Sequence, residues 1–70
     1  MNYSKKYRIL TLDGHILGYR STKRKAVELA IQQSIRLAES IEVKKRNADG
    51  EYEYCTMAMN PYKFGGIDEA

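Results

Sequence analysis

The sequence predicts an α+β domain of ββαββ order, an antiparallel sheet of two hairpins with one helix packed on one face. Two observations predict the hairpins: Asp13-Gly14 and Asp49-Gly50 each follow a segment of β-prone residues, and Gly supplies the positive φ that hairpin turns require. A third observation predicts the helix, because residues 23–40 carry apolar side chains at helical spacing.

No repeat or linker divides the 70 residues. We therefore expect a single domain over residues 1–61, followed by a C-terminal tail over residues 62–70. Asn60-Pro61 marks the boundary, since Pro has no backbone N–H to donate to a strand ladder.

The first hairpin is predicted to join strands over residues 7–12 and 15–20. A two-residue turn would pair Arg8 with Tyr19 and Leu10 with Leu17 on one side, with Ile9 and Ile16 on the other. A three-residue loop would re-pair these residues, and the sequence leaves that alternative open.

The helix is predicted to begin after an N-cap at Thr22 or Ser21. Most of its apolar residues fall within one arc, which we expect to face the sheet: Val27, Ala30, Ile31, Ser34, Leu37, Ala38 and Ile41, with Ile35 at the edge. Leu29 lies off this arc, so we expect it to contact a partner or the tail.

For the second hairpin, Asn47-Ala48-Asp49-Gly50 predicts a turn with Gly50 at positive φ, which pairs Asn47 with Glu51. This register puts two apolar pairs on the core side, Val43 with Cys55 and Ile41 with Met57, and places Lys45 opposite Glu53 on the same side. The other side then carries Lys44 with Tyr54, Arg46 with Tyr52, and Glu42 with Thr56.

Charge is unevenly distributed along the chain. The net charge is +3, but residues 1–46 sum to +7 and residues 47–70 to −4. A basic surface of this kind favours an anionic partner. Cys55 is the single cysteine, which excludes an internal disulfide and favours a reducing, cytoplasmic setting. Since no apolar run is long enough to span a membrane, we expect no membrane partner.

Catalytic and metal chemistry find little support in the residue types. One His and one Cys cannot supply a structural zinc site, so we expect no metal and no cofactor. Cys55 is predicted to face the core, and His15 has no acidic partner close in sequence. We therefore expect a protein that is not an enzyme.

Three cations stand where a helix normally prefers acids. Lys23, Arg24 and Lys25 begin the helix, although the positive end of the helix dipole disfavours cations by about 0.3–1 kcal/mol each. Such a cluster beside free backbone amides is typical of an anion-binding site. An equally simple interpretation is that these side chains extend into solvent.

A second candidate site lies on the sheet. Lys44, Arg46, Tyr52 and Tyr54 are predicted to share the face away from the core, and Arg8 and Tyr19 extend it. Cations suit phosphates and flat rings suit unpaired bases, so the combination favours nucleic acid. Cross-strand packing of Tyr on Lys and Arg stems is the structural alternative, and an anionic protein surface is another.

By its layout, the chain resembles a family of small, uncharacterised bacterial and phage domains. The residues that carry this resemblance lie in the helix and the second hairpin: Ser21-Thr22, Ala26-Val27, Ala30, Ile41, Val43, Gly50 and Asn60-Pro61. The chain is also similar to phage accessory proteins, including anti-CRISPR proteins, a resemblance that implies stoichiometric binding to host machinery.

These observations predict a small, non-enzymatic binding or regulatory protein of phage or mobile-element type that presents a basic surface to nucleic acid. The alternative is a protein–protein inhibitor of host nucleic-acid-handling or defence machinery. Because one helix leaves aliphatic residues of the first hairpin uncovered, a homodimer is a further expectation.

Overall fold

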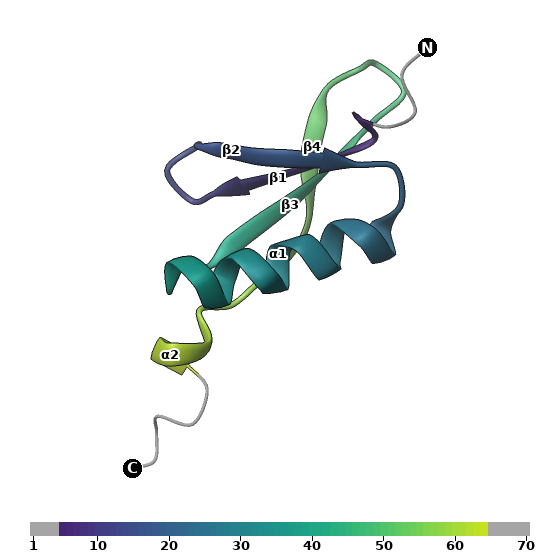
Figure 1. Ribbon diagram of the computed structural model, residues 1–70. Helices are drawn as coiled ribbons and strands as arrows, with labels where there is room; N and C mark the ends of the chain where they lie inside the picture. The colour runs from purple at the N-terminus through teal and green to yellow at the C-terminus, as the bar shows by residue number, and fades with distance from the viewer. Residues whose placement is uncertain (1–4, 65–70) are drawn as a thin grey trace.

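The computed structural model describes residues 5–64. In these residues the chain forms β1 (Tyr7–Thr11), β2 (Ile16–Arg20), α1 (Lys23–Leu37), β3 (Ile41–Arg46), β4 (Tyr52–Ala58) and a short α2 (Pro61–Phe64). The four strands form one antiparallel sheet in the order β2-β1-β3-β4, and α1 lies across one face of it (Figure 1). The ββαββ architecture is confirmed, and the pairing of β1 with β3 joins the two hairpins.

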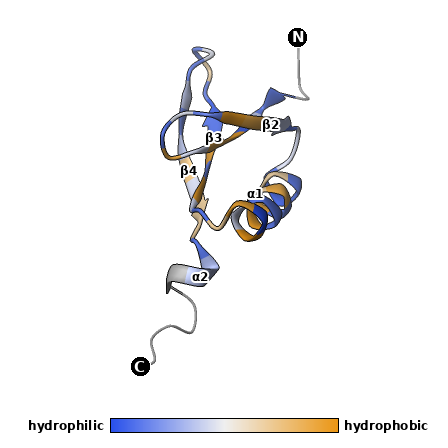
Figure 2. Ribbon diagram, turned by 60° about the vertical axis from the view of Figure 1, so that its left-hand side comes forward, coloured by the Kyte–Doolittle hydropathy of each residue, from blue (hydrophilic) through white to orange (hydrophobic). Residues whose placement is uncertain are grey.

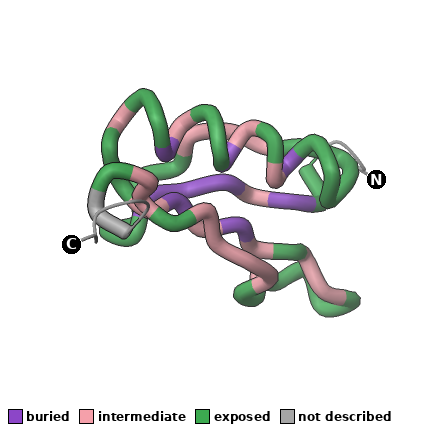
Figure 3. Tube along the Cα trace, turned by 90° about the horizontal axis from the view of Figure 1, so that it is seen from below, coloured by how far each residue is buried: buried purple, intermediate pink, exposed green. Residues whose placement is uncertain are grey.

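The core lies between α1 and the side of the sheet that we call the covered face. Its fully buried large side chains are Ile9, Ile41 and Val43, from the two central strands. Around α1 the hydropathy alternates, with hydrophobic and hydrophilic segments following one another along each turn (Figure 2). The buried segments of the helix and of the strands face one another (Figure 3).

The helix meets the sheet through its small residues. Ala26, Ala30 and Ser34 are its buried residues, and side chains of this size let the helix backbone approach the strands closely. The predicted arc is therefore wrong in part, because Ile31 and Ile35 are 47% and 49% exposed.

Leu29 is also corrected by the structure. We expected it to contact a partner or the C-terminal tail, but it is half-buried and packs against the core cluster. Its Cδ2 atom would lie 3.3 Å from a Cβ placed at Gly18. The absence of a side chain at Gly18 thus leaves room on β2 for Leu29.

Both hairpins use the same three-residue loop. In the first, the Thr11 N–H donates to the His15 carbonyl at 2.9 Å, and Gly14 has φ of 94°. In the second, the Asn47 N–H donates to the Glu51 carbonyl at 2.7 Å, and Gly50 has φ of 86°. The predicted turn at Gly50 is confirmed, and the three-residue alternative is the correct one for the first hairpin.

The residue that precedes each loop also holds the turn through its side chain. The Asn47 Oδ1 atom accepts from the backbone N–H groups of Asp49 and Glu51, at 2.9 and 3.0 Å. The Thr11 hydroxyl accepts from the His15 N–H at 3.0 Å and donates to the Asp13 carboxylate. That last hydrogen bond is the main reason why the pKa of Asp13 lies below its usual value.

Each edge strand contains one extra residue, which shifts its register against the neighbouring central strand. In β2, Gly18 pairs with Ile9 and Ile16 with Leu10, which leaves Leu17 as the extra residue. The predicted Leu10–Leu17 pair is wrong because the three-residue loop pairs Leu10 with Ile16. The extra residue then restores the predicted Arg8–Tyr19 pair, and Leu17 packs against the core cluster.

In β4, Cys55 is the extra residue. Its neighbour Tyr54 pairs with Lys44, but Thr56 pairs with Val43, so the strand shifts between these pairs. The predicted pairs Val43–Cys55, Ile41–Met57 and Glu42–Thr56 are wrong, and the observed ones are Val43–Thr56, Ile41–Ala58 and Glu42–Met57. Cys55 still packs against the core cluster, since the bulge turns it toward α1.

The ends of α1 differ in how well the sequence predicts them. Thr22 is the N-cap, as predicted, and its hydroxyl accepts from the Lys25 N–H at 3.3 Å. The helix ends at Leu37 rather than Ser40, because Ala38 adopts a left-handed conformation with φ of 55°. Of the helices in residues 5–64, none has the length and apolar character needed to cross a membrane.

Candidate nucleic-acid interface

One row of residues crosses all four strands on the side of the sheet away from α1. Tyr19 pairs with Arg8, Arg8 with Lys44, and Lys44 with Tyr54. Because successive side chains on a strand alternate and Ile9 and Val43 are buried under α1, this row projects to the other side. Arg46 and its partner Tyr52 lie on the same side, two residues along β3 and β4.

We call these six residues, Arg8, Tyr19, Lys44, Arg46, Tyr52 and Tyr54, the open face. Sequence reasoning placed all six together, and the strand registers place them so. The register at this end was predictable because both pairings, Lys44 with Tyr54 and Arg46 with Tyr52, lie between the turn and the bulge of the second hairpin.

Arg8 is held between two of the rings. Its guanidinium carbon lies 3.9 Å from the centroid of the Tyr52 ring and 5.6 Å from that of Tyr19. The two rings themselves lie 6.2 Å apart at 57°. The Tyr52 hydroxyl donates to the Lys5 carbonyl at 2.5 Å, and the Lys5 ammonium lies 5.3 Å from the Tyr19 ring. These contacts tie both rings into the protein.

The charge of Arg8 is not neutralised by these contacts. Its Nε atom is buried without a hydrogen-bond partner, and among the described residues its guanidinium meets no carboxylate. A guanidinium stacked on aromatic rings keeps its edge available for hydrogen bonds. Its terminal nitrogens are not among the buried unsatisfied atoms, so they remain available for a ligand.

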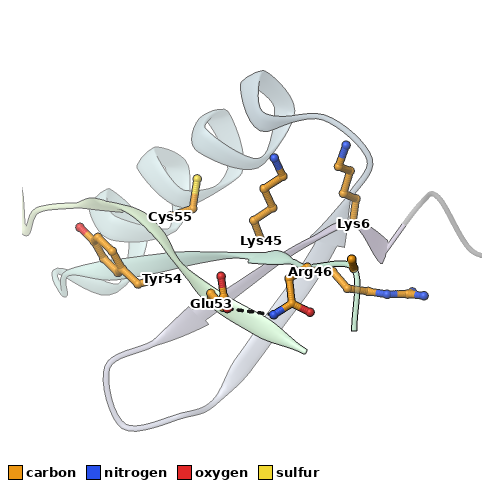
Figure 4. Close-up of a pocket in the computed structure, with 8 residues that line it drawn as sticks. Lys6, Lys45, Arg46, Glu53, Tyr54 and Cys55 are labelled. Atoms are coloured by element: carbon orange, nitrogen blue, oxygen red, sulfur yellow. Dashed lines mark hydrogen bonds between the residues drawn. The ribbon is translucent and has the colours of Figure 1, made fainter. Parts of the chain in front are cut away.

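Tyr54 stands apart from this cluster. It is 62% exposed, and none of the ring–ring or cation–ring contacts of the described residues involves it. Tyr54 borders a surface depression of about 520 Å³ at the base of the second hairpin. The wall of this depression also includes Lys6, Lys45, Arg46 and Glu53, so three cations and one carboxylate lie beside the ring (Figure 4).

Three lysines at the same end of the sheet as this row were missed by sequence reasoning, and two of them, Lys6 and Lys45, point toward the side that α1 covers (Figure 4). Lys5 contacts Tyr19 and Tyr52, while Lys6 and Lys45 line the depression. Because Lys45 lies opposite Glu53, an ion pair between these two side chains would be expected. The two do pair in the sheet, but the Glu53 carboxylate accepts from the Asn47 side-chain amide at 2.8 Å (Figure 4). Thus Lys45 is not engaged by Glu53.

Lys23, Arg24 and Lys25 lie elsewhere. They form the first turn of α1, which packs on the covered face, so they do not join the open face. In the described part of the chain the one ion pair is Arg24 with Glu28, at 3.6 Å. Both side chains are well exposed, so this pair contributes only a few tenths of a kcal/mol, about 0.3–0.5.

Metal-ligating side chains are scattered in residues 5–64. There, no group of three or more His, Cys, Asp or Glu side chains is placed to hold a metal ion. Cys55 is a free, half-buried thiol. When the chain is compared with family models, with curated proteins and with solved structures, none of the three gives a match.

Proposed function

We propose that this protein binds nucleic acid through the open face of its sheet. The observation that carries the proposal is the row of Tyr19, Arg8, Lys44 and Tyr54, in which two central cations lie between a ring on each edge strand. Lysine and arginine supply phosphate contacts, and these contacts provide most of the affinity of non-specific nucleic-acid binding.

The surroundings of the row support the same proposal. Lys5, Lys6, Lys45 and Arg46 add positive charge at the same end of the sheet. The acidic residue of the open side, Glu42, pairs with Leu10 and Met57 toward the other end. A strand of nucleic acid laid across the row would therefore meet cations along its length.

Lys23, Arg24 and Lys25 enter the proposal only through long-range attraction. They lie at the start of the helix on the covered face, and charges are screened over about 8–10 Å at physiological salt. We expect a triple substitution to Glu to lower affinity at low salt and to matter much less at high salt.

The test is a titration of a fluorescent single-stranded oligonucleotide with the full chain between 50 and 200 mM salt. Affinity is expected to fall with salt, and Lys44→Gln is expected to lower the slope of log affinity against log salt by about 0.7, one phosphate contact. Arg36→Gln is the matched control, because Arg36 is an exposed cation on α1 whose side chain bonds to Gln33.

Two results would overturn the proposal. One is the absence of binding to both the single strand and its duplex at 50 mM salt, and the other is an equal effect of Lys44→Gln and Arg36→Gln. The rival function, inhibition of a host nucleic-acid-handling or defence protein by direct contact, predicts a different outcome. The host protein would then be captured from lysate after nuclease treatment, with little dependence on salt.

A further inference from the structure

We infer that the ligand is an unpaired strand, and that Tyr54 is the one ring of the open face that stacks on a base. This inference rests on the proposed function and specifies the class of nucleic acid that the same surface takes. Its basis is that Tyr19, Tyr52 and Tyr54 have different surroundings in the structure, a difference that the sequence alone does not reveal.

Tyr52 is occupied. One face of its ring is covered by the Arg8 guanidinium at 3.9 Å, and its hydroxyl is fixed by the Lys5 carbonyl at 2.5 Å. A base would have to displace the guanidinium to stack there, which would remove a cation–π contact already made within the protein.

The Tyr19 ring is likewise engaged in contacts within the protein. The ring is approached by the Arg8 guanidinium at 5.6 Å, the Lys5 ammonium at 5.3 Å and the Tyr52 ring at 6.2 Å. Both Tyr19 and Tyr52 are only partly exposed. These two rings therefore position Arg8, and its terminal nitrogens are left to meet a phosphate.

Tyr54 is free and well placed. Its ring is 62% exposed, its hydroxyl makes no hydrogen bond within the described residues, and it pairs across the sheet with Lys44. A base on Tyr54 would bring its own backbone phosphates toward Lys44 and Arg46. In a duplex the flat faces of the bases are covered by their neighbours, so this stack requires an unpaired nucleotide.

The experiment compares Tyr54→Ala with Tyr62→Ala in the full chain. Tyr62 is the matched control, because it is also 62% exposed but lies on α2, away from the open face. The probes are a single-stranded oligonucleotide, its duplex, and an oligonucleotide of the same length made of abasic sites. Tyr54→Ala is expected to weaken binding of the single strand about 5- to 100-fold, the range for loss of one base stack.

The abasic probe separates stacking from other effects. The wild type should bind it as weakly as Tyr54→Ala binds the base-bearing strand, and Tyr54→Ala should lose no further affinity for it. Tyr19→Ala should weaken binding of the base-bearing single strand and of the abasic strand by the same factor, because the Tyr19 ring positions Arg8 and meets no base.

The outcomes distinguish this inference from the proposed function. Failure of the wild type to bind any of the three probes overturns both. If the wild type binds but prefers the duplex, or if Tyr54→Ala behaves like Tyr62→Ala, the open face still binds nucleic acid and the inference about Tyr54 is wrong.

Discussion

The two faces of this sheet are built from the same strands and differ in burial and charge. On the covered face, Ile9, Ile41 and Val43 are fully buried against the small residues of α1. On the open face, their sequence neighbours Arg8 and Lys44 lie in a row of rings and cations. Burial of the first set stabilises the fold, which leaves the second set free to be selected for binding. The predictions below test whether this separation holds.

The largest effect is expected on the covered face. Ile9→Ala should lower the free energy of unfolding by about 2–5 kcal/mol, because Ile9 is fully buried and the truncation leaves a cavity. Ile16→Ala is the control, since Ile16 is 44% exposed on the edge strand and should cost less than about 1 kcal/mol. Chemical denaturation measures both.

If the Ile9→Ala variant does not fold, a milder pair of substitutions to Val tests the same difference between the two positions. Ile9→Val should cost about 0.5–1.5 kcal/mol and Ile16→Val close to nothing. Equal costs at the two positions would contradict the assignment of faces.

A smaller loss of stability is expected at the turn of the second hairpin, which sets the register and therefore which residues lie on the open face. Gly50→Val should destabilise the protein by more than about 1 kcal/mol, because Gly50 has φ of 86° and β-branched residues resist that conformation. Ala48→Val, in the same loop but without positive φ, is the control and should cost much less. Similar melting temperatures for the two variants would argue against this turn.

Within the open face, stability should depend on Tyr52 and not on Tyr54. Tyr52→Phe removes the hydrogen bond to the Lys5 carbonyl and should cost about 0.5–1.5 kcal/mol. Tyr54→Phe should change stability by less than about 0.5 kcal/mol, because among the described residues the Tyr54 hydroxyl has no partner. The reverse order in urea denaturation would show that the roles of the two rings are exchanged.

The smallest effect concerns the helix that covers the core. Lys25→Glu should stabilise the protein by a few tenths of a kcal/mol, about 0.3–1 at most, because it replaces a cation at the positive end of the helix dipole. Arg36→Glu, in the last turn, should change stability in the opposite direction. Thermal melts at low salt would reveal both shifts, and shifts of one sign would rule out the dipole as their cause.

The same two faces show what the sequence was able to predict. Local signals were reliable: the positions of both Asp-Gly turns, the Thr22 cap and the pairs nearest the second turn stand as predicted, although the first turn has the three-residue loop that the sequence left as an alternative. They depend on neighbouring residues and on the conformational freedom of Gly, which a sequence displays directly.

Features that depend on tertiary packing were not predictable. The bulges at Leu17 and Cys55 bring each side chain toward α1, and no local sequence pattern predicts these bulges. The rotation of α1, which buries Leu29 and exposes Ile31, follows from the close contact of Ala26 and Ala30 with the sheet. The unequal surroundings of Tyr52 and Tyr54 likewise needed the position of Arg8 in space.

The central claim is that nucleic acid binds on the open face, and an amide-resolved NMR titration with a single-stranded oligonucleotide tests it most directly. We predict that the backbone signals of Arg8, Tyr19, Lys44 and Tyr54 shift together with one apparent Kd, while those of Ile31 and Ile35 on α1 stay in place. Shifts gathered along α1, or none at 50 mM salt with oligonucleotide in excess, would contradict the account.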